Sequence, residues 1–312
     1  MIQDDVLFDN LAFIVTDEQH RFGVAQRAEL LEKGESPHLL VMSATPIPRT
    51  LALMIFGDLD LSILDELPPG RQKISTYLID STIRPRALNF MKKHINNGNQ
   101  CYIVCPLVEE NDTNMASVEE YAERLKDTAL GSCRIAVLHG KMKASKKDEI
   151  MTEFKNGNID VLVSTTVIEV GVDVPNAVIM MIENAERFGL SQLHQLRGRV
   201  GRGTVKSHCI LVSDAQNEGT LERLKIMCKT NDGFKLADED LRMRGPGDFF
   251  GSRQHGLPDL KIAGLSSMVS INDAKEAAEM IIADDPTLSE KQHKPLAFEV
   301  KRLFSSVGGT LN

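Results

Sequence analysis

The fold is decided by Ile159–Ile182, which reads IDVLVSTTVIEVGVDVPNAVIMMI. Two apolar runs, Ile159–Ser164 and Ala177–Ile182, stand on either side of a segment that is richer in polar and small residues. Short, nearly unbroken apolar runs of this kind are typical of strands that are buried on both faces of a sheet. The pattern therefore predicts an α/β fold built on a parallel sheet.

The same alternation of strand and helix extends outward in both directions from this stretch. It predicts a complete parallel α/β domain over residues 71–215. The expected strands are Ile74–Leu78, Cys101–Pro106, Arg134–Leu138, Ile159–Ser164, Ala177–Ile182 and Cys209–Val212. The expected helices are Thr82–Ile95, Ser117–Leu130, Lys146–Asn156 and Ser191–Arg199.

Two further regions flank this domain. Residues 1–70 repeat the α/β rhythm until Leu67–Arg71, where two prolines and a glycine predict a domain boundary. Residues 216–312 predict a small helical region with a glycine-rich connection at Gly245–Pro258. In the first region the expected strands are Leu11–Thr16 and Leu39–Ser43 and the expected helices Arg21–Lys33 and Pro46–Phe56; in the last, the expected helices are Leu221–Lys229, Phe234–Arg244, Asp273–Ala283 and Ala297–Ser305.

Composition excludes several classes of protein. The chain has 312 residues and a net charge of −8, from 36 Lys+Arg and 44 Asp+Glu. It contains no apolar run near the roughly 18 residues that a membrane span needs, and its N-terminus lacks the pattern of a signal peptide. Five cysteines without a CxxC pair favour a reduced, cytoplasmic protein. The acidic balance argues against general coating of nucleic acid but permits a local basic track.

Polar residues follow the two strands expected in the first region. Asp17-Glu18-Gln19-His20 comes directly after the first, and adjacent carboxylates there suit a Mg²⁺-nucleotide site. Ser43-Ala44-Thr45-Pro46 ends the second, with hydroxyls that can bond these carboxylates. The alternatives are a helix start favoured by acidic residues and a helix cap.

The strongest local signal is Gln195–Gly203, QLRGRVGRG. Arg197, Arg199 and Arg202 lie among glycines, so we expect their guanidinium groups to be presented to phosphoryl oxygens. A solvated basic loop is the alternative. Farther upstream, Ser164–Asp173 ends a strand with hydroxyls and a carboxylate that suit a ribose, a phosphate or a nucleic-acid strand, or else form an ordinary polar turn.

The order of these motifs resembles a known family. DExH, SAT, HGKM (His139–Met142), STTVIEVGVD and QxxGRxGR follow one another as in superfamily 2 helicases, whose two RecA-like domains of the P-loop NTPase type clamp ATP between them. DEQHRFGVAQR and MSATPIPRTLAL are similar to the RecG branch of this superfamily. Asn231–Pro258, NDGFKLADEDLRMRGPGDFFGSRQHGLP, resembles the TRG segment that RecG shares with the bacterial transcription-repair coupling factor.

This resemblance implies ATP and Mg²⁺ as cofactors and branched or forked DNA as partner. It implies that Asp17 binds Mg²⁺ through water and that Glu18 activates the hydrolytic water. Gln195 would sense the γ-phosphate, and Arg199 and Arg202 would be arginine fingers. The other implied roles are coupling of nucleotide to DNA (His20, Ser43, Thr45), contact with nucleotide or strand (Thr165, Gly171, Asp173), proximity to the DNA backbone (His139, Gly140) and movement along duplex DNA (Arg244, Arg253, Gln254).

One motif of the family is missing from the sequence: it contains no GxxxxGK[ST] phosphate loop. Nor is the wedge domain of RecG recognisable in it. We therefore expect this chain to be the C-terminal part of a RecG-type motor, to need N-terminal wedge and phosphate-loop regions, and to hydrolyse ATP poorly by itself. We also expect an open strand edge beside Leu11–Thr16.

Two other functions remain open at this point. One is a non-catalytic DNA-binding or interaction module derived from a helicase, which the absent phosphate loop favours. The other is an RNA helicase of the DExH kind, against which the TRG-like segment argues.

Overall fold

The computed structural model describes residues 3, 5–18, 24–43, 60, 62–64, 66, 68, 71–106, 113–165, 173–244 and 268–306. Contacts divide the chain into two compact units. The first consists of Met1–Pro46 and Glu66–Leu236, and the second of Ile47–Asp65 and Ala237–Asn312. The division into residues 1–70, 71–215 and 216–312 stays a prediction.

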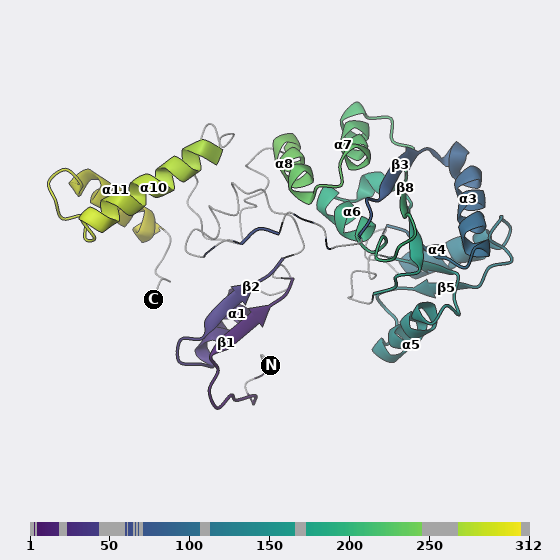
Figure 1. Cartoon of the computed structure of the whole chain (residues 1–312), viewed down its shortest axis with the longest axis horizontal. Coiled ribbons are helices and arrows are strands. Elements are labelled where there is room, and N and C mark those ends of the chain that lie inside the picture. Colours follow the sequence, from purple (N-terminus) through teal and green to yellow (C-terminus); the bar gives the residue numbers. More distant parts are fainter. Residues whose placement is uncertain are drawn as a thin grey trace. The chain divides into compact units, whose positions relative to one another are not determined.

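The centre of the first unit is a six-stranded sheet in the order β3-β8-β7-β4-β6-β5, and every neighbouring pair is parallel (Figure 1). The predicted α/β fold is confirmed. The strands are β3 (Ser75–Ile79), β4 (Gln100–Val104), β5 (Ile135–Leu138), β6 (Val161–Ser164), β7 (Ala177–Ile182) and β8 (His208–Val212).

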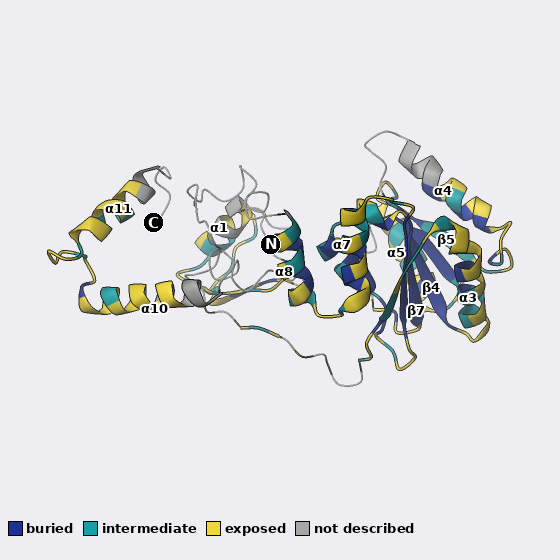
Figure 2. Ribbon diagram, turned by 90° about the horizontal axis from the view of Figure 1, so that it is seen from above, coloured by how far each residue is buried: buried dark blue, intermediate teal, exposed yellow. Residues whose placement is uncertain are grey.

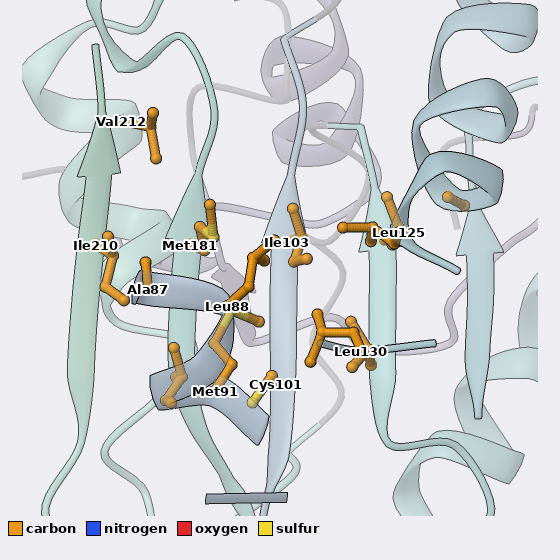
Figure 3. Packing of buried hydrophobic residues seen from close by; sticks show 14 of the residues in the cluster. Ala87, Leu88, Met91, Cys101, Ile103, Leu125, Leu130, Met181, Ile210 and Val212 are labelled. Atoms are coloured by element: carbon orange, nitrogen blue, oxygen red, sulfur yellow. The ribbon is translucent and has the colours of Figure 1, made fainter. Parts of the chain in front are cut away.

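The inner strands are buried along their whole length because helices cover both faces of the sheet; Figure 2 shows β4 and β7 as buried strands. On one face, α3 (Arg84–Asn96) and α4 (Thr113–Leu125) contribute Leu88, Met91 and Leu125 to a cluster with Ile103 and Met181 (Figure 3). Burial of each such side chain contributes about 1.5–3 kcal/mol.

The opposite face of the sheet is covered in part by α5 (Ala144–Lys155). Tyr102, which alternates with the inward Cys101 and Ile103 of β4, packs its ring 4.9 Å from that of Phe154 in this helix. Two more helices complete the domain, α6 (Leu190–Arg197) and α7 (Glu218–Lys229).

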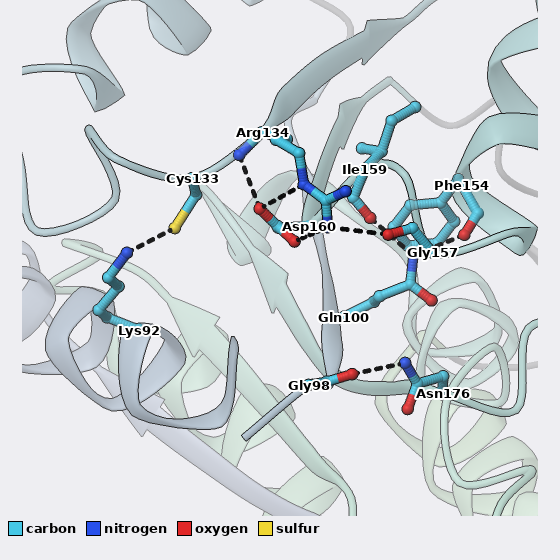
Figure 4. A network of polar contacts seen from close by, with 10 residues as sticks. All are labelled: Lys92, Gly98, Gln100, Cys133, Arg134, Phe154, Gly157, Ile159, Asp160 and Asn176. Atoms are coloured by element: carbon cyan, nitrogen blue, oxygen red, sulfur yellow. Dashed lines mark hydrogen bonds and ion pairs between the residues drawn. The ribbon is translucent and has the colours of Figure 1, made fainter. Parts of the chain in front are cut away.

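Polar contacts join the loops at the amino ends of the strands (Figure 4). Arg134 forms an ion pair with Asp160, with 2.6 Å between Nη2 and Oδ1. The buried Gln100 amide donates to the carbonyl oxygens of Phe154 and Ile159 at 2.5 and 2.7 Å. These bonds give partners to polar groups whose burial without a hydrogen bond would cost free energy.

The five cysteines are all free thiols. Cys101, Cys105 and Cys209 are buried, and Cys101 and Cys105 belong to the apolar cluster, as expected for core residues. Within the described part of the chain no group of three or more His, Cys, Asp or Glu residues is placed to hold a metal ion.

A separate, two-stranded parallel sheet is formed by β1 (Phe13–Thr16) and β2 (His38–Val41), with α1 (Val24–Glu32) between them in sequence. Ile14 and Thr16 are buried, whereas Phe13 and Val15 are about half exposed. Among the described residues neither strand has a second neighbour. The open edge beside Leu11–Thr16 stays a prediction. The predicted helix Pro46–Phe56 lies outside the described residues.

The C-terminal region is helical as predicted, with α8 (Gly233–Arg244), α10 (Met268–Asp284) and α11 (Lys294–Ser306). Asp285 forms the turn between the last two by accepting from the backbone N–H groups of Ser289 and Glu290 at 3.0 and 2.8 Å. Gly245–Pro258 lies outside the described residues. None of the described helices has the length and apolar character that crossing a membrane requires.

Candidate functional site

The carboxyl edge of the six-stranded sheet carries a row of polar residues. The Thr165 N–H donates to the Leu138 carbonyl at 3.3 Å, and the Glu183 N–H donates to the Val104 carbonyl at 2.8 Å. The residues that follow neighbouring strands therefore lie next to one another at the edge where α/β sheets bind ligands.

His139 and Thr165 are neighbours on this edge, one residue past β5 and β6. Both are buried, with 4% and 2% of their surfaces exposed. His139 Nδ1 and Thr165 Oγ1 have no hydrogen-bond partner in the described part of the chain. Because an unpaired buried polar group is costly, such atoms point to a ligand. Gly140, the next residue, accepts a bond at 2.6 Å from Lys147 Nζ, which fixes the loop.

The arginine motif divides into a buried and a partly exposed part. Arg197, the last residue of α6, is 2% exposed, and its Nη1 donates to the carbonyl oxygens of Met227 and Thr230 at 2.9 Å each. The expectation that Arg197 is presented to a ligand is therefore wrong. Since those carbonyls stand at the C-terminal end of α7, where helical partners run out, Arg197 joins α6 to α7.

Arg202 lies in the loop after α6 and is 29% exposed. Its Nη1 is 3.2 Å from Asp173 Oδ1, and its Nε donates to the Gly198 carbonyl at 3.4 Å. The structure thus brings together two predicted site residues from distant motifs. Arg199 is half-buried; its charge and that of Arg202 both oppose the rise that burial causes in the pKa of Tyr102, so the two guanidinium groups act on the same part of the sheet.

We call residues 198–204 the arginine loop, and at two positions, Gly201 and Gly203, packing leaves little room for a side chain. Gly201 has φ +79°, and a Cβ there would lie 3.0 Å from Ile74 Cγ1. A Cβ at Gly203 would lie 2.5 Å from the Pro175 carbonyl oxygen. A loosely solvated basic loop has no such requirement, so this alternative is less favoured. Gln195 is half-buried one turn before the loop, in α6.

The DExH carboxylates follow β1 directly. The Asp17 carboxylate is exposed and its Oδ1 accepts from the Glu18 N–H at 2.8 Å. Glu18 has φ +52°, a left-handed conformation that is uncommon outside glycine and concentrates at functional sites. Ser43 lies at the same edge of this small sheet, since the Met42 N–H donates to the Thr16 carbonyl at 2.8 Å. Exposed carboxylate oxygens are ligands that suit Mg²⁺.

Several predicted residues lie outside the described part of the chain: His20, Thr45, Gly171, Arg253 and Gln254. Arg244 is the last residue of α8.

Sequence reasoning missed one polar cluster on this edge. Glu183 is 3% exposed and accepts from Arg84 at 3.0 and 2.9 Å and from the Tyr121 hydroxyl at 2.7 Å. It borders a cavity of about 390 Å³. The cavity lies beyond the carboxyl ends of β4 and β7, where chain connections diverge to opposite sides. A carboxylate directly after an apolar run, as in Asp17, was the available signal.

Comparison with known proteins gives two family matches. Residues 85–204 match the helicase conserved C-terminal domain, and residues 230–305 match the C-terminal part of domain 3 of the ATP-dependent DNA helicase RecG. The ATP-dependent DNA helicase RecG of Bacillus subtilis is 47% identical over 302 residues, which cover 96% of this chain and 44% of that protein. The Synechocystis protein of the same name is 48% identical over 315 residues, covering 100% of this chain and 38% of its own length.

The chain therefore spans less than half the length of these relatives.

Among solved structures, RecG bound to a three-way DNA junction matches with a TM-score of 0.68 and 44% identity, over 88% of this chain and 35% of that one. Dbp5 of S. cerevisiae bound to RNA and ADP BeF3 matches with a TM-score of 0.51 at 15% identity, over 75% of this chain and 63% of that one, which supports the fold alone.

Proposed function

We propose that this chain is part of a branched-DNA motor of the RecG type of superfamily 2 helicase, the part that couples ATP hydrolysis to movement on DNA; the two family matches and the 47% and 48% identity to RecG proteins support this. The observation that carries the proposal is the arginine loop. Gly201 and Gly203 allow its backbone to pass close to Ile74 and Pro175, and Arg202 is held partly exposed beside Asp173.

We assign the chemistry of hydrolysis to two groups of residues. In the first, Glu18 takes the proton of the attacking water, and Asp17 is the residue that would hold Mg²⁺ through water. When bound, Mg²⁺ neutralises charge on the phosphoryl oxygens. In the second, Arg199 and Arg202 stabilise the charge that spreads over those oxygens in the transition state, and Gln195 senses the γ-phosphate. His20, Ser43 and Thr45 couple the nucleotide site to DNA, and Gly171 and Asp173 face the nucleotide or the DNA strand.

We assign DNA contact to the other strand ends. The unpaired buried atoms of His139 and Thr165, with Gly140 beside them, support a phosphate-contacting role. Arg244, Arg253 and Gln254 complete it as the segment that moves along duplex DNA. The relative solved with a three-way junction supports branched DNA as the substrate. Remodelling of stalled forks and Holliday junctions in the cytoplasm, during repair and recombination, is the corresponding cellular role.

The experiment is a full-length chimaera in which this chain replaces the matching 302 residues of the Bacillus subtilis relative. We expect DNA-stimulated ATP hydrolysis that Glu18→Gln and Arg202→Ala abolish. Lys155→Ala, an exposed change at the end of α5, is the matched control and should leave the rate unchanged. Equal rates in all three variants would remove the site assignment.

The non-catalytic module makes a different prediction. By itself the 312-residue chain would bind forked DNA with an affinity that falls steeply with salt, while the chimaera would show no DNA-stimulated turnover. Turnover in the chimaera that depends on Glu18 decides in favour of the motor.

A further inference from the structure

The segment Arg71–Ile74, which we call the strap, contacts the arginine loop at both ends. Arg71 Nη2 donates to the Gly198 carbonyl at 3.0 Å. The neighbouring Gln72 Nε2 donates to the Thr204 carbonyl at 2.9 Å. Gly198 and Thr204 are the first and last residues of the loop, so two adjacent side chains hold both of its ends.

The strap also packs against the middle of the loop. Ile74 is 8% exposed. Its Cγ1 would lie only 3.0 Å from the Cβ of a side chain at Gly201. Directly after the strap, the Ser75 N–H donates to the Ser207 carbonyl at 3.1 Å and the β3–β8 pairing starts. The strap therefore has a firm anchor on its C-terminal side.

Arg71 and Arg202 meet at one acceptor. The Gly198 carbonyl accepts from Arg71 Nη2 and also from Arg202 Nε. The two arginines also share an electrostatic field with Asp173: burial and the charge of Arg202 lower the pKa of Arg71, and Asp173 opposes the shift. A displacement of Arg71 therefore changes both the hydrogen bonding and the charge around Arg202.

We propose that Arg71 and Gln72 are positioning residues for the arginine finger Arg202. This inference rests on the proposed function. It extends that function because it names two residues outside the arginine motif that hold the arginine loop at Gly198 and Thr204.

The kinetic test uses the chimaera described above. Arg71→Ala should lower kcat by about 10- to 100-fold and leave the KM for ATP unchanged, since misplacement of a group acting in the transition state costs rate rather than binding. Arg71→Lys, which can still donate to Gly198, should recover part of the rate. Lys73→Ala, the exposed neighbour within the strap, is the matched control and should behave as the unaltered protein.

Coupling to Arg202 is tested on an Arg202→Lys background. There Arg71→Ala should add little further loss, because the group that it positions has already been changed. Losses that multiply in full would overturn the proposal, and so would equal kcat values for Arg71→Ala and Lys73→Ala. An inactive unaltered chimaera would instead count against the proposed function.

A second measurement does not depend on activity. Hydrogen exchange of the 312-residue chain should be faster in residues 198–206 when Arg71 and Gln72 are both alanine, and unchanged in α3. Protection equal to that of the unaltered chain would overturn the proposal even if turnover had fallen. Faster exchange throughout the sheet would show a general loss of structure and would also count against it.

Discussion

Arg197 and Arg202 belong to one motif, but their surroundings give them different roles. Replacing Arg197 by Met keeps most of the volume and leaves the Met227 and Thr230 carbonyls without their donor. We expect a loss of about 2–4 kcal/mol in the free energy of unfolding, since each buried acceptor left unpaired costs roughly 1–3 kcal/mol. Arg202→Met breaks an ion pair with an exposed aspartate and should cost less than about 1 kcal/mol. Urea unfolding of the chain measures both, and equal losses would contradict the division of roles.

His194 makes stability depend on pH. Burial, with a contribution from the charge of Arg197, lowers the pKa of its imidazole to about 4, against about 6.5 in an unfolded chain. Between these values the unfolded chain binds more protons than the folded one, so stability falls as pH falls.

We therefore expect the unaltered chain to lose about 2 kcal/mol more than His194→Gln between about pH 7.5 and pH 5. Burial also lowers the pKa values of His94 and His208. Both residues are present in the two proteins, so their contributions to the pH dependence of stability cancel in the difference. Parallel pH profiles for the two proteins would show that His194 is not buried in its neutral form.

At the scale of elements, the arginine loop depends on the absence of a side chain at Gly201. Gly157 has the same φ of +79° with nothing within 4 Å of its ideal Cβ, and so provides the control. Gly157→Ala should cost roughly 1–2 kcal/mol from the left-handed backbone alone. Gly201→Ala should cost roughly 1–3 kcal/mol more because of the contact with Ile74. Thermal unfolding of the two variants tests this, and an equal shift in Tm would mean that the strap does not crowd the loop.

Individual elements were predictable where a short pattern determines them. The strand Ala177–Ile182 is β7 without change, because a run of apolar residues in an α/β rhythm has few other places to lie. The start of α3 was less predictable. Asp80 accepts from the Thr82 and Ile83 N–H groups and inserts a short 3₁₀ turn at Ser81–Ile83, so the helix begins at Arg84.

What sequence could not supply was the partner of each side chain. Arg197 and Arg202 look alike in sequence, and only the packing of α6 on α7 buries one of them. Strand order likewise depends on contacts between distant parts of the chain, because β4 pairs with β6 and β7. The sequence places Arg71 only within a predicted boundary, since nothing local indicates that its guanidinium reaches the arginine loop.

At the scale of the whole molecule, the sequence predicts how fast the 312-residue chain hydrolyses ATP by itself. The sequence contains the carboxylates and arginines to which we assign hydrolysis, but no GxxxxGK[ST] loop to cradle the phosphates. We expect no turnover above background, with or without forked DNA. Turnover that disappears in Glu18→Gln would mean that another part of this chain cradles the phosphates.

The different burial of the five cysteines predicts which of them react with a thiol reagent in the folded protein. Cys228 is exposed, although partial burial raises the pKa of its thiol, and Cys133 is half-buried. Burial raises the pKa of Cys105 and Cys209 to about 12, and Cys101 is equally enclosed in β4. An alkylating reagent should therefore modify Cys228 and Cys133 in the native protein and reach the three enclosed thiols only when the sheet opens. The rate of that slow labelling would measure how often the six-stranded domain opens, without any introduced probe.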